Sequence, residues 1–123
     1  MKKIFITLFF FICLPANAVE KKTNFSIDIF EKAKDSGKTV VVNSYEVWCG
    51  TCSKQTKILD QAEKKFKDII FLSYEQSKNK DIAKNLSIDF WATIVVYKGN
   101  DEVARIIGQT DKKTIYSALQ KGI

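Results

Sequence analysis

Two cysteines separated by two residues, Cys49 and Cys52, constrain this chain most strongly. They follow the β-branched run Thr39–Val42, which is typical of a buried strand. The apolar positions Ile58, Leu59, Ala62 and Phe66 then recur at helical spacing and predict a helix from Cys52 to about Phe66. A cysteine at the start of a helix meets unpaired N–H groups and the positive end of the helix dipole, which favour its thiolate. We therefore expect Cys49 to be a nucleophile.

The first residues have the pattern of a secretory signal peptide. Two lysines precede the apolar stretch Ile4–Leu14, and Ala16 and Ala18 form an A-x-A cleavage site. The stretch is too short to span a bilayer core comfortably, which takes roughly 20 residues. We expect a signal peptide over residues 1–18, cleavage after Ala18, and one domain over residues 19–123 without a membrane span.

The chain has three cysteines and no histidine. Cys13 lies in the signal peptide, so cleavage leaves the pair Cys49 and Cys52. Lipid attachment at Cys13 is disfavoured by Ile12, because lipoprotein signals place a small residue there. The absence of histidine excludes Cys–His and Ser–His catalytic pairs, and two cysteines are too few for a structural zinc site. We therefore predict no metal site.

The charged residues predict a solvated surface. The formal net charge is +6, and about four positive charges stay with the domain once the signal peptide is removed. Lysines are interspersed with acids, as in Glu63–Lys67, and no long run of like charge occurs. This pattern argues against nucleic-acid binding and leaves a mild preference for acidic partners.

The remaining elements complete an α/β pattern. Helices are expected over Phe25–Lys34 (ending near Gly37), Asp81–Leu86 and Thr110–Leu119, the last capped from Thr110 or Asp111. Strands are expected over Ile69–Leu72, Thr93–Tyr97 and Glu102–Ile107. Turn residues between the last two strands predict an antiparallel hairpin. The order of the elements indicates a mixed central sheet with helices on both faces.

The motif Trp48-Cys49-Gly50-Thr51-Cys52 resembles that of thioredoxins, with Thr51 where proline is commonest. The order and spacing of the surrounding strands are also similar, over nearly all of residues 19–123. A CxxC pair alone is shared with zinc sites, whereas WCxxC between a buried strand and a helix is far more specific. The resemblance implies a thioredoxin fold and a thiol:disulfide oxidoreductase that needs no cofactor beyond its own Cys49–Cys52 disulfide.

The resemblance also implies roles for single residues. Cys49 is the attacking thiol, Cys52 is the buried resolving thiol, and Trp48 shields the pair on one side. The alternative is a structural disulfide, but a bridge that closes so small a loop removes little entropy from the unfolded chain. The expected partners are protein thiols and disulfides, and we expect a monomer.

Two departures from the family concern buried charge. Most thioredoxins carry a buried Asp six residues before the first cysteine and a Lys facing it, where this chain has Asn43 and Phe71. Losing both charges together is physically consistent, because a lone buried charge is costly. Proton transfer at Cys52 then needs water or another group, and Glu46 is the nearest candidate in the sequence.

A third departure lies in the loop before the strand that faces the disulfide. The family has a cis-proline there, whereas this chain has Trp91, Ala92 and Thr93. A cis bond before a residue other than proline costs about 2.5–4 kcal/mol, so we expect a trans Trp91–Ala92 peptide and a loop of different shape. The change is compatible with altered partner choice, slower release, metal tolerance at the thiols or neutral drift.

Two functions are compatible with these features. The first is a periplasmic thiol:disulfide oxidoreductase, which we expect to be a reductant because no histidine lies between its cysteines to favour an oxidising potential. A membrane electron donor would re-reduce the disulfide of such an enzyme. The reduced enzyme would then act in cytochrome c maturation or disulfide repair. The second is a binding module that holds a metal or an unfolded partner with little turnover, as the missing cis-proline suggests.

Overall fold

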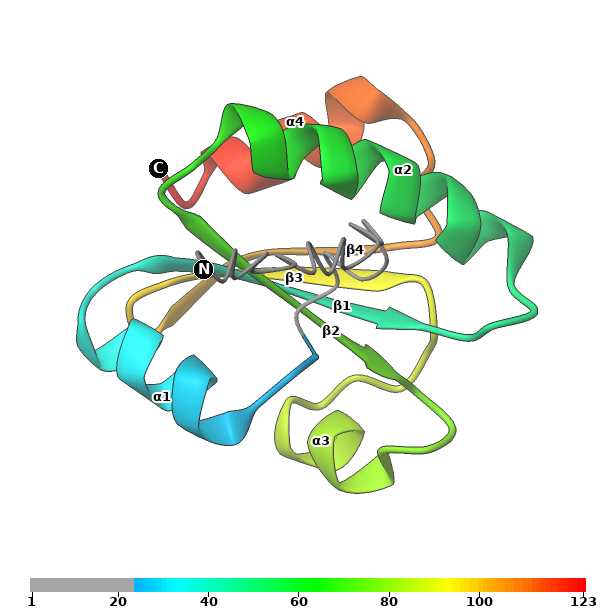
Figure 1. Ribbon diagram of the computed structural model, residues 1–123, viewed down its shortest axis with the longest axis horizontal. Helices are drawn as coiled ribbons and strands as arrows, with labels where there is room; N and C mark the ends of the chain where they lie inside the picture. Colours follow the sequence, from blue (N-terminus) through cyan, green and yellow to red (C-terminus); the bar gives the residue numbers. More distant parts are fainter. Residues whose placement is uncertain (1–23) are drawn as a thin grey trace, which may run out of the picture.

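The computed structural model describes residues 24–123, so the predicted signal peptide and Cys13 lie outside the described residues. In chain order the elements are α1 (Ile27–Asp35), β1 (Thr39–Tyr45), α2 (Gly50–Lys65), β2 (Ile69–Glu75), α3 (Lys80–Asn85), β3 (Thr93–Lys98), β4 (Asp101–Ile107) and α4 (Lys112–Gln120). Every predicted helix and strand is present, with shifted ends (Figure 1). Within the described part of the chain, no helix combines the length and apolar character needed to cross a membrane.

The four strands form one mixed sheet in the order β2-β1-β3-β4. β1 runs parallel to β2, with Thr39 opposite Ile69, and antiparallel to β3. β3 and β4 form the predicted antiparallel hairpin, whose turn includes Gly99 at a φ of +56°. Ser44 near the end of β1 lies opposite Thr93 at the start of β3, which in turn pairs with Ile107 at the end of β4. These three strand ends therefore meet at one end of the sheet.

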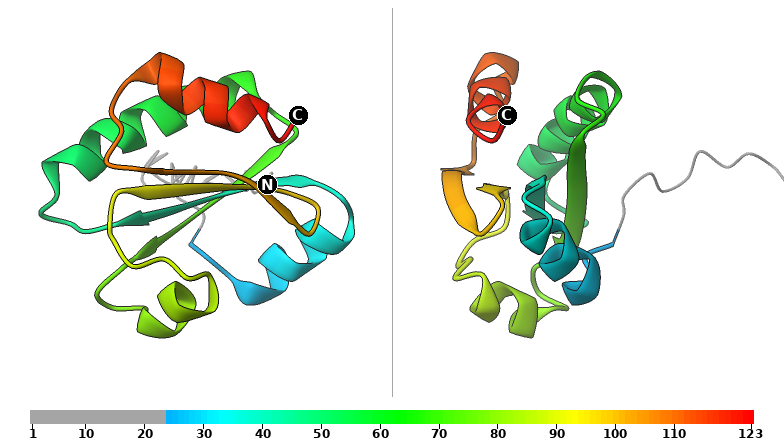
Figure 2. Two further views of the ribbon diagram at one scale, coloured as in Figure 1. Left: turned by 180° about the vertical axis from the view of Figure 1, so that it is seen from behind. Right: turned by 90° about the vertical axis from the view of Figure 1, so that its left-hand side faces the viewer.

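Helices cover both faces of the sheet, α1 and α3 on one face and α2 and α4 on the other (Figures 1 and 2). The side chains of β1 alternate between these layers. Val40 and Val42 pack in a cluster with residues of α1 and α3, and Val41 packs in a second cluster with residues of α2 and α4. Complete burial of a side chain of this size stabilises the fold by about 1.5–3 kcal/mol. Because β1 has apolar side chains on both faces, each face of the sheet must be covered by helices.

Helix caps and polar strand residues account for the shifted ends. α2 begins at Gly50 because Cys49 is its N-cap. α4 begins after Asp111, whose carboxylate accepts a hydrogen bond from the Thr114 N–H at 2.9 Å. This confirms the predicted capping from Thr110 or Asp111, although the helix itself begins at Lys112 and not at Thr110. Hydrogen bonds from Thr114 hold the pKa of Asp111 below its ordinary value. β1 and β2 continue through polar residues, with Asn43 opposite Ser73, so they are longer than their apolar runs predict.

Candidate active site

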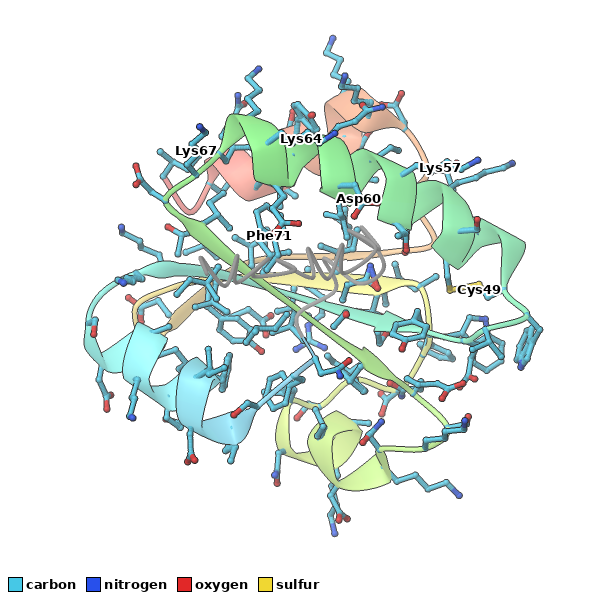
Figure 3. The ribbon with its side chains drawn as sticks, in the orientation of Figure 1. Cys49, Lys57, Asp60, Lys64, Lys67 and Phe71 are labelled. Atoms are coloured by element: carbon cyan, nitrogen blue, oxygen red, sulfur yellow. A yellow bond between two sulfur atoms is a disulfide. The ribbon has the colours of Figure 1, made fainter. Side chains whose placement is uncertain are left out.

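Cys49 and Cys52 form a disulfide at the start of α2 (Figure 3). Cys49 caps the helix, and its Sγ accepts a hydrogen bond from the Cys52 N–H at 3.1 Å. The exposed fraction is 8% for Cys49 and 2% for Cys52. An N–H donor and the positive end of a helix both stabilise a thiolate at the cap position. The geometry therefore suits Cys49 as the attacking thiol and Cys52 as the buried resolving thiol.

The other residues of the motif lie where the chain enters the helix. Gly50 and Thr51 form the first turn of α2. Trp48 is 67% exposed, and its ring meets the ring of Trp91 edge-on at a centroid distance of 5.0 Å. Trp48 thus packs on the tryptophan of the loop before β3 and leaves most of its surface in solvent.

The loop before β3 packs on the disulfide through Ala92. Ala92 is buried and shares one apolar cluster with Cys49 and Cys52. The structure has no cis peptide bond within residues 24–123, so the predicted trans Trp91–Ala92 peptide is confirmed. Ala92 has a φ of +58°, a left-handed conformation that nothing in the sequence signals and that costs an alanine roughly 1–2 kcal/mol.

Hydrogen bonds from β1 hold this loop in place. The Ser44 carbonyl accepts from the Ala92 N–H at 2.9 Å, and the Ser44 hydroxyl donates to the Phe90 carbonyl at 2.8 Å. The same hydroxyl accepts from the Thr93 N–H at 3.2 Å, and Thr93 Oγ1 donates to the Phe90 carbonyl at 2.7 Å. Of the predicted loop residues, Ala92 is therefore held against the disulfide on a framework supplied by Ser44, while Trp91 packs on Trp48 and Thr93 bonds within the framework.

The backbone at Ala92 predicts a limit on side-chain size. We expect Ala92→Val to lower the free energy of unfolding by about 3 kcal/mol, because a β-branched side chain is disfavoured at positive φ and would overpack the buried disulfide. Ala92→Gly should stay within about 1 kcal/mol of wild type, since relief of the φ strain offsets a freer unfolded chain and a lost methyl contact. Urea unfolding of the oxidised proteins measures both changes.

Ala118→Val is the control for added volume at a residue with helical backbone, because Ala118 is buried within α4. We expect it to cost less than Ala92→Val. Equal losses at the two positions would contradict a conformational limit at Ala92.

Asn43 stands at the position of the family's buried Asp, but the residue that faces it on β2 is Ser73. The expectation that Phe71 takes the place of the facing Lys is therefore wrong, because the register of the parallel β1–β2 pair puts Phe71 two residues earlier. Asn43 is 4% exposed, and its Oδ1 has no hydrogen-bond partner among the described residues. Phe71 lies opposite Val41 and packs against the cluster under α2 and α4 (Figure 3). The facing pair Asn43 and Ser73 is uncharged, so no lone charge is buried there, which agrees with the expected loss of both charges.

Glu46 lies beside the disulfide but is engaged elsewhere. Its carboxylate accepts hydrogen bonds from the Ser77 N–H at 2.6 Å and the Ser77 hydroxyl at 3.0 Å. A cavity of about 390 Å³ is lined by Glu46 together with Cys49, Cys52 and Lys57, among others. Glu46 and Cys52 therefore share one cavity, and proton transfer between them stays a prediction.

Four exposed apolar residues flank the disulfide and the Ala92 loop in the chain. We call this set the aromatic rim, and it consists of Val47, Trp48, Phe90 and Trp91, which are 77%, 67%, 57% and 44% exposed. Two of its residues immediately precede Cys49, and two immediately precede Ala92. Exposed apolar patches of this kind mark sites of contact with other proteins.

Several residues of the site, among them Val47 and Phe90 of the aromatic rim, have no part in the sequence predictions, and two of them support the loop before β3. Ser44 gives no signal, because a serine within a strand has no distinctive pattern. Gln55 gives one: it is a polar residue at a fully buried position of α2, in register with the buried Cys52, Leu59 and Ala62. A glutamine on the apolar face of a predicted helix therefore warrants attention.

Comparisons with known proteins agree with this geometry. The sequence model described as Thioredoxin matches residues 17–121. The chain is 35% identical over 79 residues to a thioredoxin H-type of Fagopyrum esculentum, covering 64% of this chain and 68% of that protein. It is 29% identical over 80 residues to thioredoxin-2 of Saccharomyces cerevisiae, covering 64% and 77%.

Solved structures show the same fold. Trxlp from Edwardsiella tarda has a TM-score of 0.76 at 24% identity, covering 79% of this chain and 96% of that chain. Mitochondrial thioredoxin 3 from Saccharomyces cerevisiae has a TM-score of 0.70 at 21% identity, covering 80% and 93%. The chain belongs to the thioredoxin family and is a thiol:disulfide oxidoreductase.

Family membership shows thiol–disulfide exchange as the class of reaction, and the geometry suggests a role for each cysteine in it. We expect the following order of steps from the positions of the two cysteines. The Cys49 thiolate attacks a partner disulfide, one partner sulfur leaves as a thiolate, and a mixed disulfide forms. The Cys52 thiol then loses its proton and attacks Cys49 Sγ, so the second partner sulfur leaves and the Cys49–Cys52 disulfide closes. The electrons come from the cysteine pair itself, so the enzyme needs no cofactor. Within residues 24–123, no group of three or more His, Cys, Asp or Glu side chains is placed to hold a metal ion.

Proposed function

We propose that this protein is an exported thioredoxin that reduces protein disulfides in the periplasm. The observation that carries the direction is the dipeptide Gly50-Thr51, which places no histidine between the cysteines. A histidine there would favour the reduced enzyme and so an oxidising potential. The pattern of residues 1–18 supports export, and the aromatic rim supports a protein as the partner.

The reduction potential of the Cys49–Cys52 pair tests the direction. We expect a value closer to that of thioredoxin, about −270 mV, than to that of a strong oxidant, about −120 mV. Equilibration in dithiothreitol or glutathione buffers, followed by alkylation of free thiols, measures it. Thr51→His is the matched variant, and we expect it to raise the potential by about 30 mV or more. A wild-type value of about −120 mV or above would exclude a reductant.

The N-terminus of the mature protein tests export. Produced from its full sequence in a Gram-negative host, the protein should be recovered from the periplasmic extract with Val19 as its first residue. Ala18→Arg, which places a large charged residue at the cleavage site, should retain the leader. A wild-type chain that keeps Met1 and stays in the cytosolic fraction would overturn the proposed compartment.

A periplasmic reductant needs a source of electrons, and we propose a membrane-bound dithiol donor that re-reduces the Cys49–Cys52 disulfide. The partner thiols that the enzyme produces would serve cytochrome c maturation or disulfide repair.

We propose that the enzyme works as a monomer, because the disulfide lies at one end of a single sheet and the aromatic rim beside it must receive the partner.

Turnover separates this function from a binding module. The reductant should catalyse the reduction of insulin by dithiothreitol. Stoichiometric copper or zinc binding by the folded protein without such catalysis would instead support the binding module, which the missing cis-proline first suggested.

A further inference from the structure

Gln55 is a buried amide in the second turn of the helix that carries the cysteines. It is 0% exposed. Its Nε2 donates hydrogen bonds to the Ala92 carbonyl at 3.0 Å and to the Gln109 carbonyl at 2.9 Å. Its Oε1 is buried and has no hydrogen-bond partner among the described residues. Burying an amide oxygen in this way costs free energy that an apolar side chain of the same size would not cost, so packing alone does not account for glutamine here.

The two bonds tie α2 to both loops beside the disulfide. Ala92 precedes β3, and Gln109 follows β4, at the end of the sheet where α2 begins (Figure 1). The loops also meet each other, because the Gly108 N–H donates to the Ala92 carbonyl at 2.9 Å. The Ala92 carbonyl thus accepts two hydrogen bonds, one from each neighbouring segment. Gln55 is the side chain that joins all three segments.

Ala92 needs such a restraint. Its φ of +58° is a conformation that an alanine keeps only when its surroundings hold it. It also lacks the ring that would fix the backbone of a proline. Because Ala92 packs directly on Cys49 and Cys52, movement of its backbone changes the surface that a partner chain meets beside the disulfide.

We propose that Gln55 is a positioning residue that holds the Ala92 loop against the cysteine pair and so seats a partner protein for attack by Cys49. Productive placement of a partner requires that the groups around the reacting atoms be fixed beforehand. Positioning by Gln55 rests on the exchange reaction of the family, and on neither the compartment nor the direction proposed above.

Gln55→Met tests this role, because methionine has a similar length and volume but no N–H donor. With insulin as the disulfide, we expect kcat/KM to fall about tenfold, mainly through a higher KM, as loss of placement predicts. With 5,5′-dithiobis(2-nitrobenzoic acid), a small disulfide that does not need the loop to seat a chain, we expect a change of less than about twofold. Equal losses with the two disulfides, or no loss with insulin, would overturn the proposal.

Leu59→Ala is the matched control, since Leu59 is buried one turn further along α2 and packs in the core under α4. It should destabilise the fold and leave the ratio of the two rates unchanged. Amide hydrogen exchange gives an independent measure: Gln55→Met should speed exchange at Ala92 and Gly108 more than at the β1 amides, whereas Leu59→Ala should not. A ratio shifted as much by Leu59→Ala as by Gln55→Met would reduce Gln55 to a packing role.

Gln55→Asn extends the test to a variant that keeps the amide and withdraws it by one methylene. Its rates with insulin and with the small disulfide are measured in the same way, and they test positioning by Gln55 if Gln55→Met does not fold. We expect the same selective loss with insulin, and wild-type kinetics with both disulfides would contradict positioning by Gln55.

Discussion

Replacing Cys49 by serine is expected to reduce the insulin-reducing activity to background, a loss on the order of 10³-fold or more. The helix N-terminus and the Cys52 N–H stabilise a thiolate at this position, but a hydroxyl stays protonated at neutral pH and does not attack a disulfide. The rate of insulin reduction by dithiothreitol, followed as turbidity, measures the effect.

Ser53→Ala is the matched control for this prediction, because Ser53 lies in the same turn of α2 and its side chain is exposed. It should retain wild-type activity. Substantial residual turnover in Cys49→Ser would mean that Cys52, at 2% exposure, reacts with partners directly, which contradicts the assignment of Cys49 as the attacking thiol.

Replacing Cys52 by alanine should stop the reaction halfway and accumulate the mixed disulfide between Cys49 and its partner. The first attack needs only Cys49, whereas release of the partner needs the second thiol. A single-turnover reaction with insulin, quenched by acid and analysed by mass spectrometry, should show nearly all of the variant linked to one insulin molecule, against a trace for wild type.

The same variant in its natural compartment should trap the physiological partners through Cys49. The double variant Cys49→Ser with Cys52→Ala is the control for adventitious capture, and it should trap none. Adducts that persist in the double variant, or a Cys52→Ala protein that turns over insulin at the wild-type rate, would contradict the two-step exchange.

Much of this fold follows from local patterns in the sequence. The β-branched run Thr39–Val42 and the apolar run Ile69–Leu72 predict the two parallel strands, because their side chains fill both layers of the core. The predicted ends of these strands were wrong. Polar residues such as Asn43 and Ser73 continue the hydrogen-bonded β1–β2 pairing, because neighbouring strands supply partners for their backbone groups.

The cysteine pair could also be placed from the sequence, because its spacing and its position between strand and helix are local properties. The supports around the pair could not. Gln55 and Ala92 are 37 residues apart, and no spacing rule connects them. The positive φ of Ala92 had no signal either, because it arises from hydrogen bonds to Ser44, Gln55 and Gly108 and not from a conformational preference of alanine.

The central claim is that Cys49 and Cys52 form a reversible redox pair that exchanges with protein disulfides, and one stoichiometric reaction tests it directly. Fully reduced wild-type protein is mixed with excess insulin. The reaction is quenched, free thiols are alkylated, and the mass of the intact protein is measured by mass spectrometry. We predict that each insulin disulfide opened is matched by one Cys49–Cys52 disulfide formed, so that two thiols of the chain escape alkylation. Opened insulin with both cysteines still alkylated, or no reaction in the folded protein, would contradict the claim.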